Sequence, residues 1–114
     1  MPNSKRITKN EQFNLSSGEI TIKSIAGDAH LTMHRIYYDN TLIKSGEGVV
    51  VAKKVAEAGK EIYIEATINL PDGSSDYASL SVEMNDDGNS ESWNYSSHEP
   101  ESNEVIYAIS IILN

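Results

Sequence analysis

The chain has 114 residues, of which 39% are hydrophobic and 23% are charged, and these proportions predict one globular domain rather than a disordered segment. It contains no cysteine, which excludes disulfides, cysteine-based zinc sites and thiol nucleophiles. The net charge of −8 argues against binding to nucleic acid or to an anionic membrane, because both need a basic surface.

The charges are distributed unevenly along the chain. All nine Lys and Arg side chains lie in the first 60 residues, which also carry six carboxylates and are therefore net +3. The rest of the chain, from Glu61 to Asn114, carries eleven carboxylates and no Lys or Arg, and is net −11. Such asymmetry indicates a partner, a cation or a charge-coded contact more than a chemical reaction.

The first ten residues predict a flexible N-terminal segment, which is followed by a single domain over residues 11–114. This segment lacks the apolar centre of a secretory signal, and no stretch approaches the roughly 20 apolar residues of a membrane helix. We therefore expect a cytoplasmic protein, or one that is exported without a conventional signal peptide.

Alternation of apolar and polar residues, which is typical of strands, dominates the chain. It predicts strands over Glu19 to Ile25 and over His30 to Tyr38, and a two-residue turn then leads into a hairpin strand over Thr41 to Lys44. The segment Val49 to Ala58 is ambiguous, because β-branched residues favour a strand while some apolar spacings are helical. We expect a strand through about Val51, followed by a bend or a short helical turn.

The clearest alternation lies between Glu61 and Leu70. Turn residues follow over 71–76, and a further strand over Tyr77 to Met84 predicts an antiparallel hairpin with one solvated face. The last segment, Val105 to Leu113, is apolar on both faces, which predicts a central, doubly covered strand or an oligomer contact. Five residues of the hairpin are expected to share one core: Ile62, Ile64, Ile68, Leu80 and Val82.

Seven or eight short strands with polar turns predict an all-β protein, an antiparallel β-sandwich of immunoglobulin-like or jelly-roll-like type. Between Ala29 and Met84 the order of elements resembles bacterial immunoglobulin-like modules, through the hairpin at Tyr37 to Asn40 and the segment Ala58 to Ala66 that enters a strand. This resemblance implies a fold and no activity.

His30 and His34 have the spacing that places two imidazoles on one face of a helix, ready for zinc. On a strand the same spacing spans about 13 Å, so the two rings cannot share one ion. The neighbouring residues favour a strand, and we expect two ordinary sheet or surface histidines.

The segment Asn85 to Glu91 is the strongest candidate for a metal site, because calcium prefers many oxygen ligands and these residues are dense in carboxylates and amides. The alternative is a solvated acidic loop, where such residues are favoured for backbone reasons. The candidate calcium ligands are Asp86, Asp87, Asn89 and Glu91.

Aromatic residues follow in the same predicted loop, which extends from Asn85 to Asn103 and is long for a compact domain. Aromatic rings beside amides and carboxylates are typical of sugar sites and protein interfaces. The alternative is that Trp93 folds back and closes one end of the sandwich. The candidate binding residues are Trp93, Asn94, Tyr95 and His98.

The chain contains no nucleophile elbow, phosphate-binding loop or dinucleotide fingerprint, so we expect that it is not an enzyme. We predict a non-catalytic β-sandwich that binds another protein or forms a homo-oligomer. The alternative is a carbohydrate- or calcium-binding module that uses the loop from Asn85 to Pro100. We also expect an acidic rim around Asp86, Asp87 and Glu91 that lysines do not neutralise.

Overall fold

The computed structural model describes residues 4–27, 32–70, 77–98 and 102–114. Within these residues all regular structure is β, which confirms the all-β prediction, and no helix is long and apolar enough to cross a membrane. The described chain has one or two strands more than the sequence predicts. The nine strands are β1 (Ser4–Phe13), β2 (Glu19–Ala26), β3 (Thr32–Tyr38), β4 (Thr41–Glu47), β5 (Val49–Val55), β6 (Glu61–Asn69), β7 (Ala78–Asp86), β8 (Asn89–Ser97) and β9 (Glu104–Leu113).

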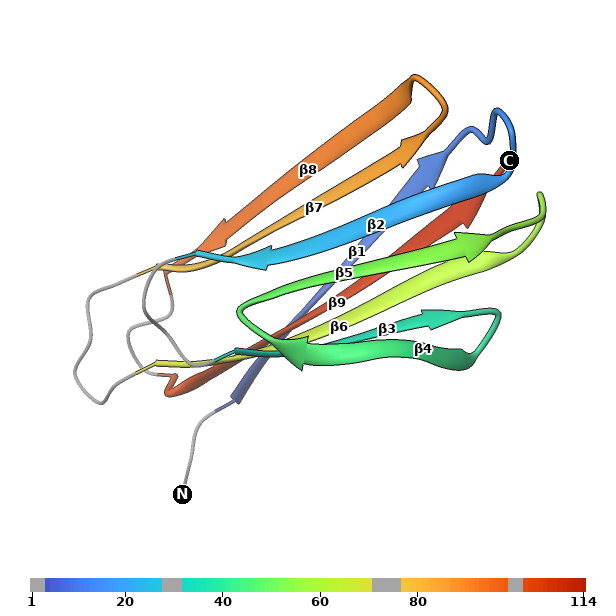
Figure 1. Cartoon of the computed structure of the whole chain (residues 1–114). Helices are drawn as coiled ribbons and strands as arrows, with labels where there is room; N and C mark the ends of the chain where they lie inside the picture. The colour runs from blue at the N-terminus through green and yellow to red at the C-terminus, as the bar shows by residue number, and fades with distance from the viewer. Residues whose placement is uncertain (1–3, 28–31, 71–76, 99–101) are drawn as a thin grey trace.

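The strands form two sheets that lie as two layers (Figure 1). One sheet has five strands in the order β1-β9-β6-β3-β4, and the other has four in the order β5-β2-β7-β8. Neighbouring strands are antiparallel except for β1 and β9, which run parallel. Buried side chains from both sheets join in one hydrophobic cluster, so the arrangement is sandwich-like.

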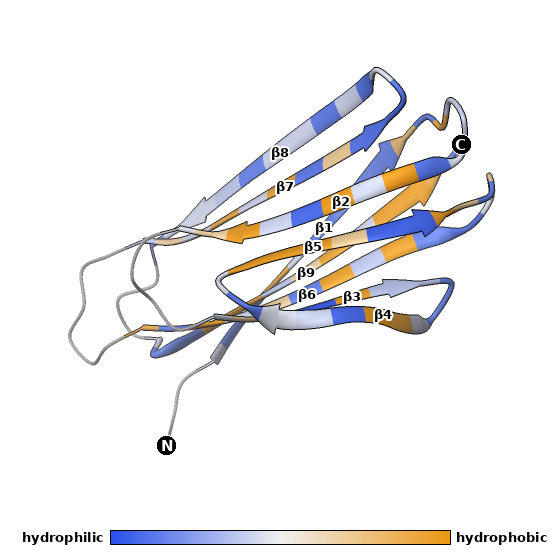
Figure 2. Ribbon diagram, viewed as in Figure 1, coloured by the Kyte–Doolittle hydropathy of each residue, from blue (hydrophilic) through white to orange (hydrophobic). Residues whose placement is uncertain are grey.

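Alternation explains how the core forms, because successive strand residues point to opposite faces of a sheet. Figure 2 shows this pattern along β2 and β6, where apolar and polar residues take turns. The five predicted core residues are each at most 1% exposed and belong to the same cluster, which confirms that prediction.

The predicted hairpin between β6 and β7 is wrong. β6 lies between β3 and β9 in the five-stranded sheet, whereas β7 lies between β2 and β8 in the other sheet. Each strand has one apolar face, and the two apolar faces meet across the core instead of lying side by side in one sheet. The predicted turn over residues 71–76 lies outside the described residues.

From Ser4 onward the segment that the sequence predicts to be flexible is a strand, β1, which pairs with β9 along its whole length. The pairing runs from Ser4 opposite Glu104 to Phe13 opposite Leu113. β1 contains only two apolar side chains, and backbone pairing to an apolar neighbour supplies the order that its own composition does not indicate.

The bend or helical turn expected after Val51 is also wrong, since β5 continues to Val55 and pairs with β2 throughout. Alternation persists across the strand, with Val50 and Ala52 buried and their neighbours facing outward. β5 is an edge strand, where outward lysines such as Lys53 are well tolerated.

Two tight turns connect antiparallel neighbours. Asp39 and Asn40, with φ of 47° and 67°, join β3 to β4 and confirm the first predicted hairpin. Asp87 and Gly88, with φ of 46° and 91°, join β7 to β8 in the same way. Positive φ at both central residues is the geometry of a type I′ hairpin turn. The long loop expected over Asn85 to Asn103 is therefore wrong, because β8 occupies its middle.

β9 lies inside the five-stranded sheet, between β1 and β6, as its apolar sequence predicts. Its inward residues are buried, and on its outer face Ala108 is 2% exposed while Ile112 is 41% exposed. The outer face of this strand is therefore only partly covered.

Candidate interaction surface

Asp86, a predicted calcium ligand, ends β7 and turns into the protein, where it is fully buried. Its carboxylate accepts hydrogen bonds from the backbone N–H groups of Ser16 (2.7 Å), Ser17 (3.0 Å) and Gly18 (2.9 Å). The Ser17 hydroxyl donates a fourth bond at 2.5 Å. Burial acts to raise the pKa of Asp86, but these hydrogen bonds outweigh it and lower the pKa to about 2. Asp86 thus anchors the loop between β1 and β2.

The other three predicted calcium ligands lie apart from Asp86. Asp87 is exposed in the turn, the Asn89 amide donates to the backbone carbonyl of Asn14, and Glu91 is exposed on β8. Within the described ranges, no three His, Cys, Asp or Glu residues are placed to hold a metal ion. The structure therefore does not bring the predicted ligands together.

The predicted binding residues are divided by the alternation of β8. Trp93 and Tyr95 lie on the inward side and pack against the hydrophobic cluster. Asn94 lies on the outer side, where its side-chain oxygen accepts a hydrogen bond from the Ser81 hydroxyl at 2.6 Å. His98 follows the end of β8, with its ring centroid 4.9 Å from that of Tyr77. These four residues do not form one aromatic platform.

A groove of about 360 Å³ lies where β1 and β8 border the open side of the sandwich. The Tyr95 hydroxyl donates to Glu11 at 2.5 Å, and burial together with this acceptor raises the pKa of Tyr95 far above its usual range. The groove is lined by Ile7, Lys9, Asn94, Tyr95, Ser96, Ser97 and Tyr107.

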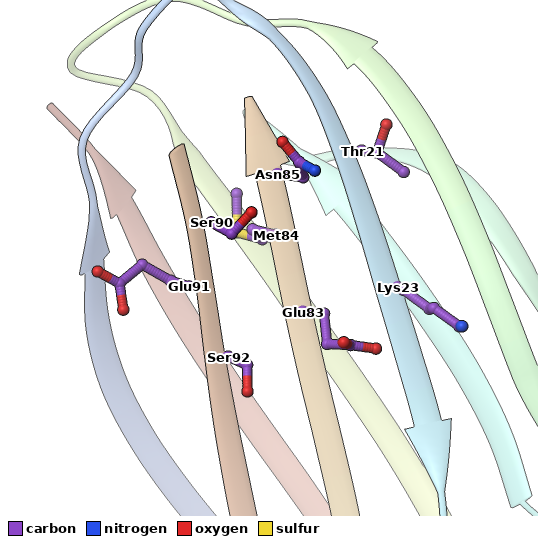
Figure 3. Close-up of a pocket in the computed structure, with 8 residues that line it drawn as sticks. All are labelled: Thr21, Lys23, Glu83, Met84, Asn85, Ser90, Glu91 and Ser92. Atoms are coloured by element: carbon purple, nitrogen blue, oxygen red, sulfur yellow. The ribbon is translucent and has the colours of Figure 1, made fainter. Parts of the chain in front are cut away.

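The outer face of the four-stranded sheet is mostly small and polar, and it contains a shallow hollow of about 320 Å³ near the β7–β8 turn (Figure 3). Lys23 on β2 and Glu83 on β7 are opposite each other in the strand register. The labelled side chains come from β2, β7 and β8: Thr21, Lys23, Glu83, Met84, Asn85, Ser90, Glu91 and Ser92.

An apolar stripe lies on the same outer face, along the edge strand β5. Val49, Val51 and Val55 point outward and are 53%, 43% and 72% exposed. Figure 2 shows that β5 is apolar in its first half and polar near its end. Exposed β-branched side chains on an edge strand are unusual, because the free side of such a strand invites pairing with another chain.

The backbone of β5 is available for pairing at the same residues. The bonds from Ala56 N to Gly18 O and from Ala26 N to Gly48 O mark hydrogen-bonded pairs at both ends of the β2–β5 ladder. Since alternate residues bond to the neighbour in an antiparallel ladder, the intervening residues direct their N–H and C=O groups to the free side. We call these residues the β5 edge: Val49, Val51, Lys53 and Val55.

A buried polar contact joins the two sheets. The ring of His34 on β3 donates from Nε2 to the Gly48 carbonyl at 2.9 Å, which leaves Nδ1 to accept a hydrogen bond from the Ser24 hydroxyl of β2 at 2.8 Å. Burial lowers the pKa of His34, although the bond to Gly48 acts to raise it. His34 and Ser24 are both fully buried, so neither reaches solvent. His30 lies outside the described residues.

No protein-family model, curated protein or solved structure significantly matches this chain. The β5 edge is not among the sites that the sequence predicts, although valines at alternate positions are the signal that could have identified it. The helical spacing of other residues in the same segment obscures that signal.

Proposed function

We propose that this protein is a non-catalytic binding module that recognises another protein, and that the β5 edge is its recognition surface. One observation carries the proposal: three of the exposed large hydrophobic side chains of the described chain, Val49, Val51 and Val55, lie on one face of one edge strand. Apolar groups clustered on a surface indicate an interaction site, whereas scattered ones do not.

The mode of recognition that fits this edge is strand addition. An extended segment of the partner would receive backbone hydrogen bonds from the β5 edge, while its alternate side chains would contact the valines. Lys53 and Lys54 on β5 would favour a partner with acidic residues near its own strand.

The absence of chemistry at this surface agrees with a binding role. The side chains of the β5 edge are three valines and one lysine, which can hold a partner, and this edge contains no serine, histidine or carboxylate that could serve as a nucleophile and its base. The one described contact that joins a serine to a histidine, Ser24 with His34, is enclosed between the sheets where no substrate can reach it.

We further propose an immunoglobulin-like frame rather than a jelly roll. The neighbouring strands β3, β6 and β9 correspond in order to strands C, F and G of that fold, and the β2–β5 pair corresponds to B and E. The β7–β8 hairpin would then be an insertion between F and G that pairs beside strand B.

Carbohydrate binding is a second candidate, which the groove between β1 and β8 favours. A sugar could stack on an aromatic ring and exchange hydrogen bonds with hydroxyl and amide groups there, and Tyr95 supplies the ring. If this candidate is right, adding the sugar changes the fluorescence of Trp93, the only tryptophan.

Capture of partners from the source cells by the immobilised protein tests the main proposal. We expect Val51→Lys to lose a partner that wild type retains, because a charged side chain would replace an exposed valine in the middle of the β5 edge. Ile112→Lys is the matched control, since Ile112 is 41% exposed on the other sheet and Val51 is 43% exposed. Equal retention by both variants, or equal loss from both, contradicts a role for the β5 edge.

A further inference from the structure

β8 is the second free edge of the sheet that contains β5. Asp86 and Asn89 flank the two-residue turn and are opposite each other, so they form a hydrogen-bonded pair across the hairpin. In an antiparallel ladder every second pair is hydrogen-bonded, so Asn89 and every second residue after it in β8 bond to β7. The residues between them direct their N–H and C=O groups to the side of β8 that has no neighbouring strand. We call these residues the β8 edge: Ser90, Ser92, Asn94 and Ser96.

The two edges have matching directions. All neighbours in this sheet are antiparallel, and the sheet has four strands, so β5 and β8 run in opposite directions. A second copy placed beside the first in the same orientation would therefore bring its β5 antiparallel to β8. The combined sheet would continue the same alternation without any strand being reversed.

We infer that the protein associates head to tail, with β8 of one copy pairing with β5 of the next. This inference rests on the proposed function, since it identifies the partner of the β5 edge as a second copy of the chain. Both edges direct the side chains of their free residues to the outer face of the sheet, so pairing them keeps outer residues beside outer residues.

One register of this pairing satisfies the side chains on the inner face. With Glu91 of one copy opposite Lys54 of the next, all seven residues of β5 lie within the length of β8. Trp93 then lies opposite Ala52, and Tyr95 lies opposite Val50. Opposite charges and aromatic–aliphatic neighbours both stabilise cross-strand pairs.

Charge favours this arrangement over a symmetric one. β5 contains two lysines and no acidic residue, whereas β8 contains one glutamate and no basic residue. A symmetric β5–β5 contact would bring four lysines to one seam, and like charges across a seam are destabilising. The head-to-tail contact instead uses the charge difference between the early and late parts of the chain.

A head-to-tail contact leaves one edge of each kind free at the ends of the assembly, so it can continue beyond two copies. Sedimentation velocity over a range of wild-type concentrations should therefore show mass that increases past the dimer. Wild type that stays monomeric at every concentration, or that stops at a dimer, overturns the inference.

Two edge-blocking variants make the test sharper. Val51→Pro and Ser92→Pro each remove one N–H that is directed to a free side, and they leave the bonds to β2 or β7 in place. Each variant alone should be monomeric. An equal mixture should form a one-to-one dimer, because one variant supplies β8 and the other supplies β5. Self-association of either blocked variant indicates a symmetric contact and overturns the inference.

Charge exchange provides a second measurement that does not depend on proline. Lys54→Glu and Glu91→Lys should each weaken association by roughly two- to fivefold, and combining them in one chain should restore it. Failure of the double variant to recover contradicts the proposed register. If wild type is monomeric, but its capture of another protein is lost in Val51→Lys, only the head-to-tail inference is overturned. If Val51→Lys changes neither self-association nor capture of another protein, the proposed function is overturned as well.

Discussion

The outer faces of the two sheets use their charged side chains differently. On the five-stranded sheet, Arg6 donates to the Tyr63 hydroxyl at 2.7 Å and lies 3.5 Å from Glu65. Arg35 lies 3.7 Å from the same carboxylate, and the ring centroids of Tyr37 and Tyr63 are 5.9 Å apart. Charges from β1, β3 and β6 thus satisfy one another within the molecule.

The four-stranded sheet lacks such a cluster on its described outer face. Lys23 and Glu83 are opposite each other in register, yet they do not form an ion pair within 4 Å. Among the described residues, no lysine forms an ion pair with Asp87 or Glu91 either. One fold therefore has a face on which Arg6, Arg35 and Glu65 pair with one another, and another face whose charges and valines are available to a partner.

Both faces depend on the same core, so the largest effect should come from breaking it. Ile64→Ala removes a fully buried side chain and should lower the free energy of unfolding by about 2–5 kcal/mol. Val55→Ala, at a position that is 72% exposed, is the control and should cost less than about 0.5 kcal/mol. Urea denaturation measures both, and similar costs would mean that β5 or β6 faces the other way.

The next largest effect should come from Asp86, which anchors the loop between β1 and β2. Asp86→Asn should lower the melting temperature more than Asp87→Asn, because only Asp86 accepts four hydrogen bonds from the loop that precedes β2. The pKa of folded Asp86 is about 2, below its ordinary value of 3.8, so its contribution is complete above pH 3.8 and lost as the pH falls toward 2. An acid titration that is the same in Asp86→Asn and wild type contradicts this role.

The strands with strong alternation could be predicted from the sequence, and the arrangement of those strands could not. β2, β3 and β6 bury one face each, and their period is visible in the residues. β1 is ordered by its pairing with β9, a contact between residues about 100 positions apart that local pattern does not contain. The same limit explains why the sequence predicts a hairpin between β6 and β7, two strands that lie in different sheets.

The candidate site shows a related limit. In the sequence Asp86 lies in a segment rich in potential metal ligands. In the structure its carboxylate instead accepts hydrogen bonds from the backbone N–H groups of residues 16–18, which are distant in sequence. Trp93, Asn94 and Tyr95 are adjacent in sequence, yet a strand sends neighbours to opposite faces. Once β8 is recognised as a strand, that separation follows directly from the alternation.

A smaller effect is expected from the histidine that joins the two layers. The pKa of folded His34 is lowered by burial, so the unfolded chain binds more protons once the pH falls below about 6.5. Stability should therefore decrease as the pH falls from 7.5 to 5.5. Chemical denaturation should show this slope reduced in His34→Gln, because the ring that lies between the sheets is then gone. If the pH dependence of stability is the same in His34→Gln as in wild type, another group takes up the proton.

The smallest effect tests the contrast between the two faces itself. Glu65→Gln removes the charge that Arg6 and Arg35 share, and because these side chains are partly exposed it should cost no more than about 1 kcal/mol. High salt should reduce that cost, since screening already weakens the pair in wild type. Glu83→Gln on the other sheet removes a charge that has no partner within 4 Å among the described residues, so we expect no loss of stability. If urea denaturation shows that both variants lose the same free energy of unfolding, Lys23 stabilises Glu83 in solution. The charges of the four-stranded face would then be paired within the molecule, as they are around Glu65 on the other sheet.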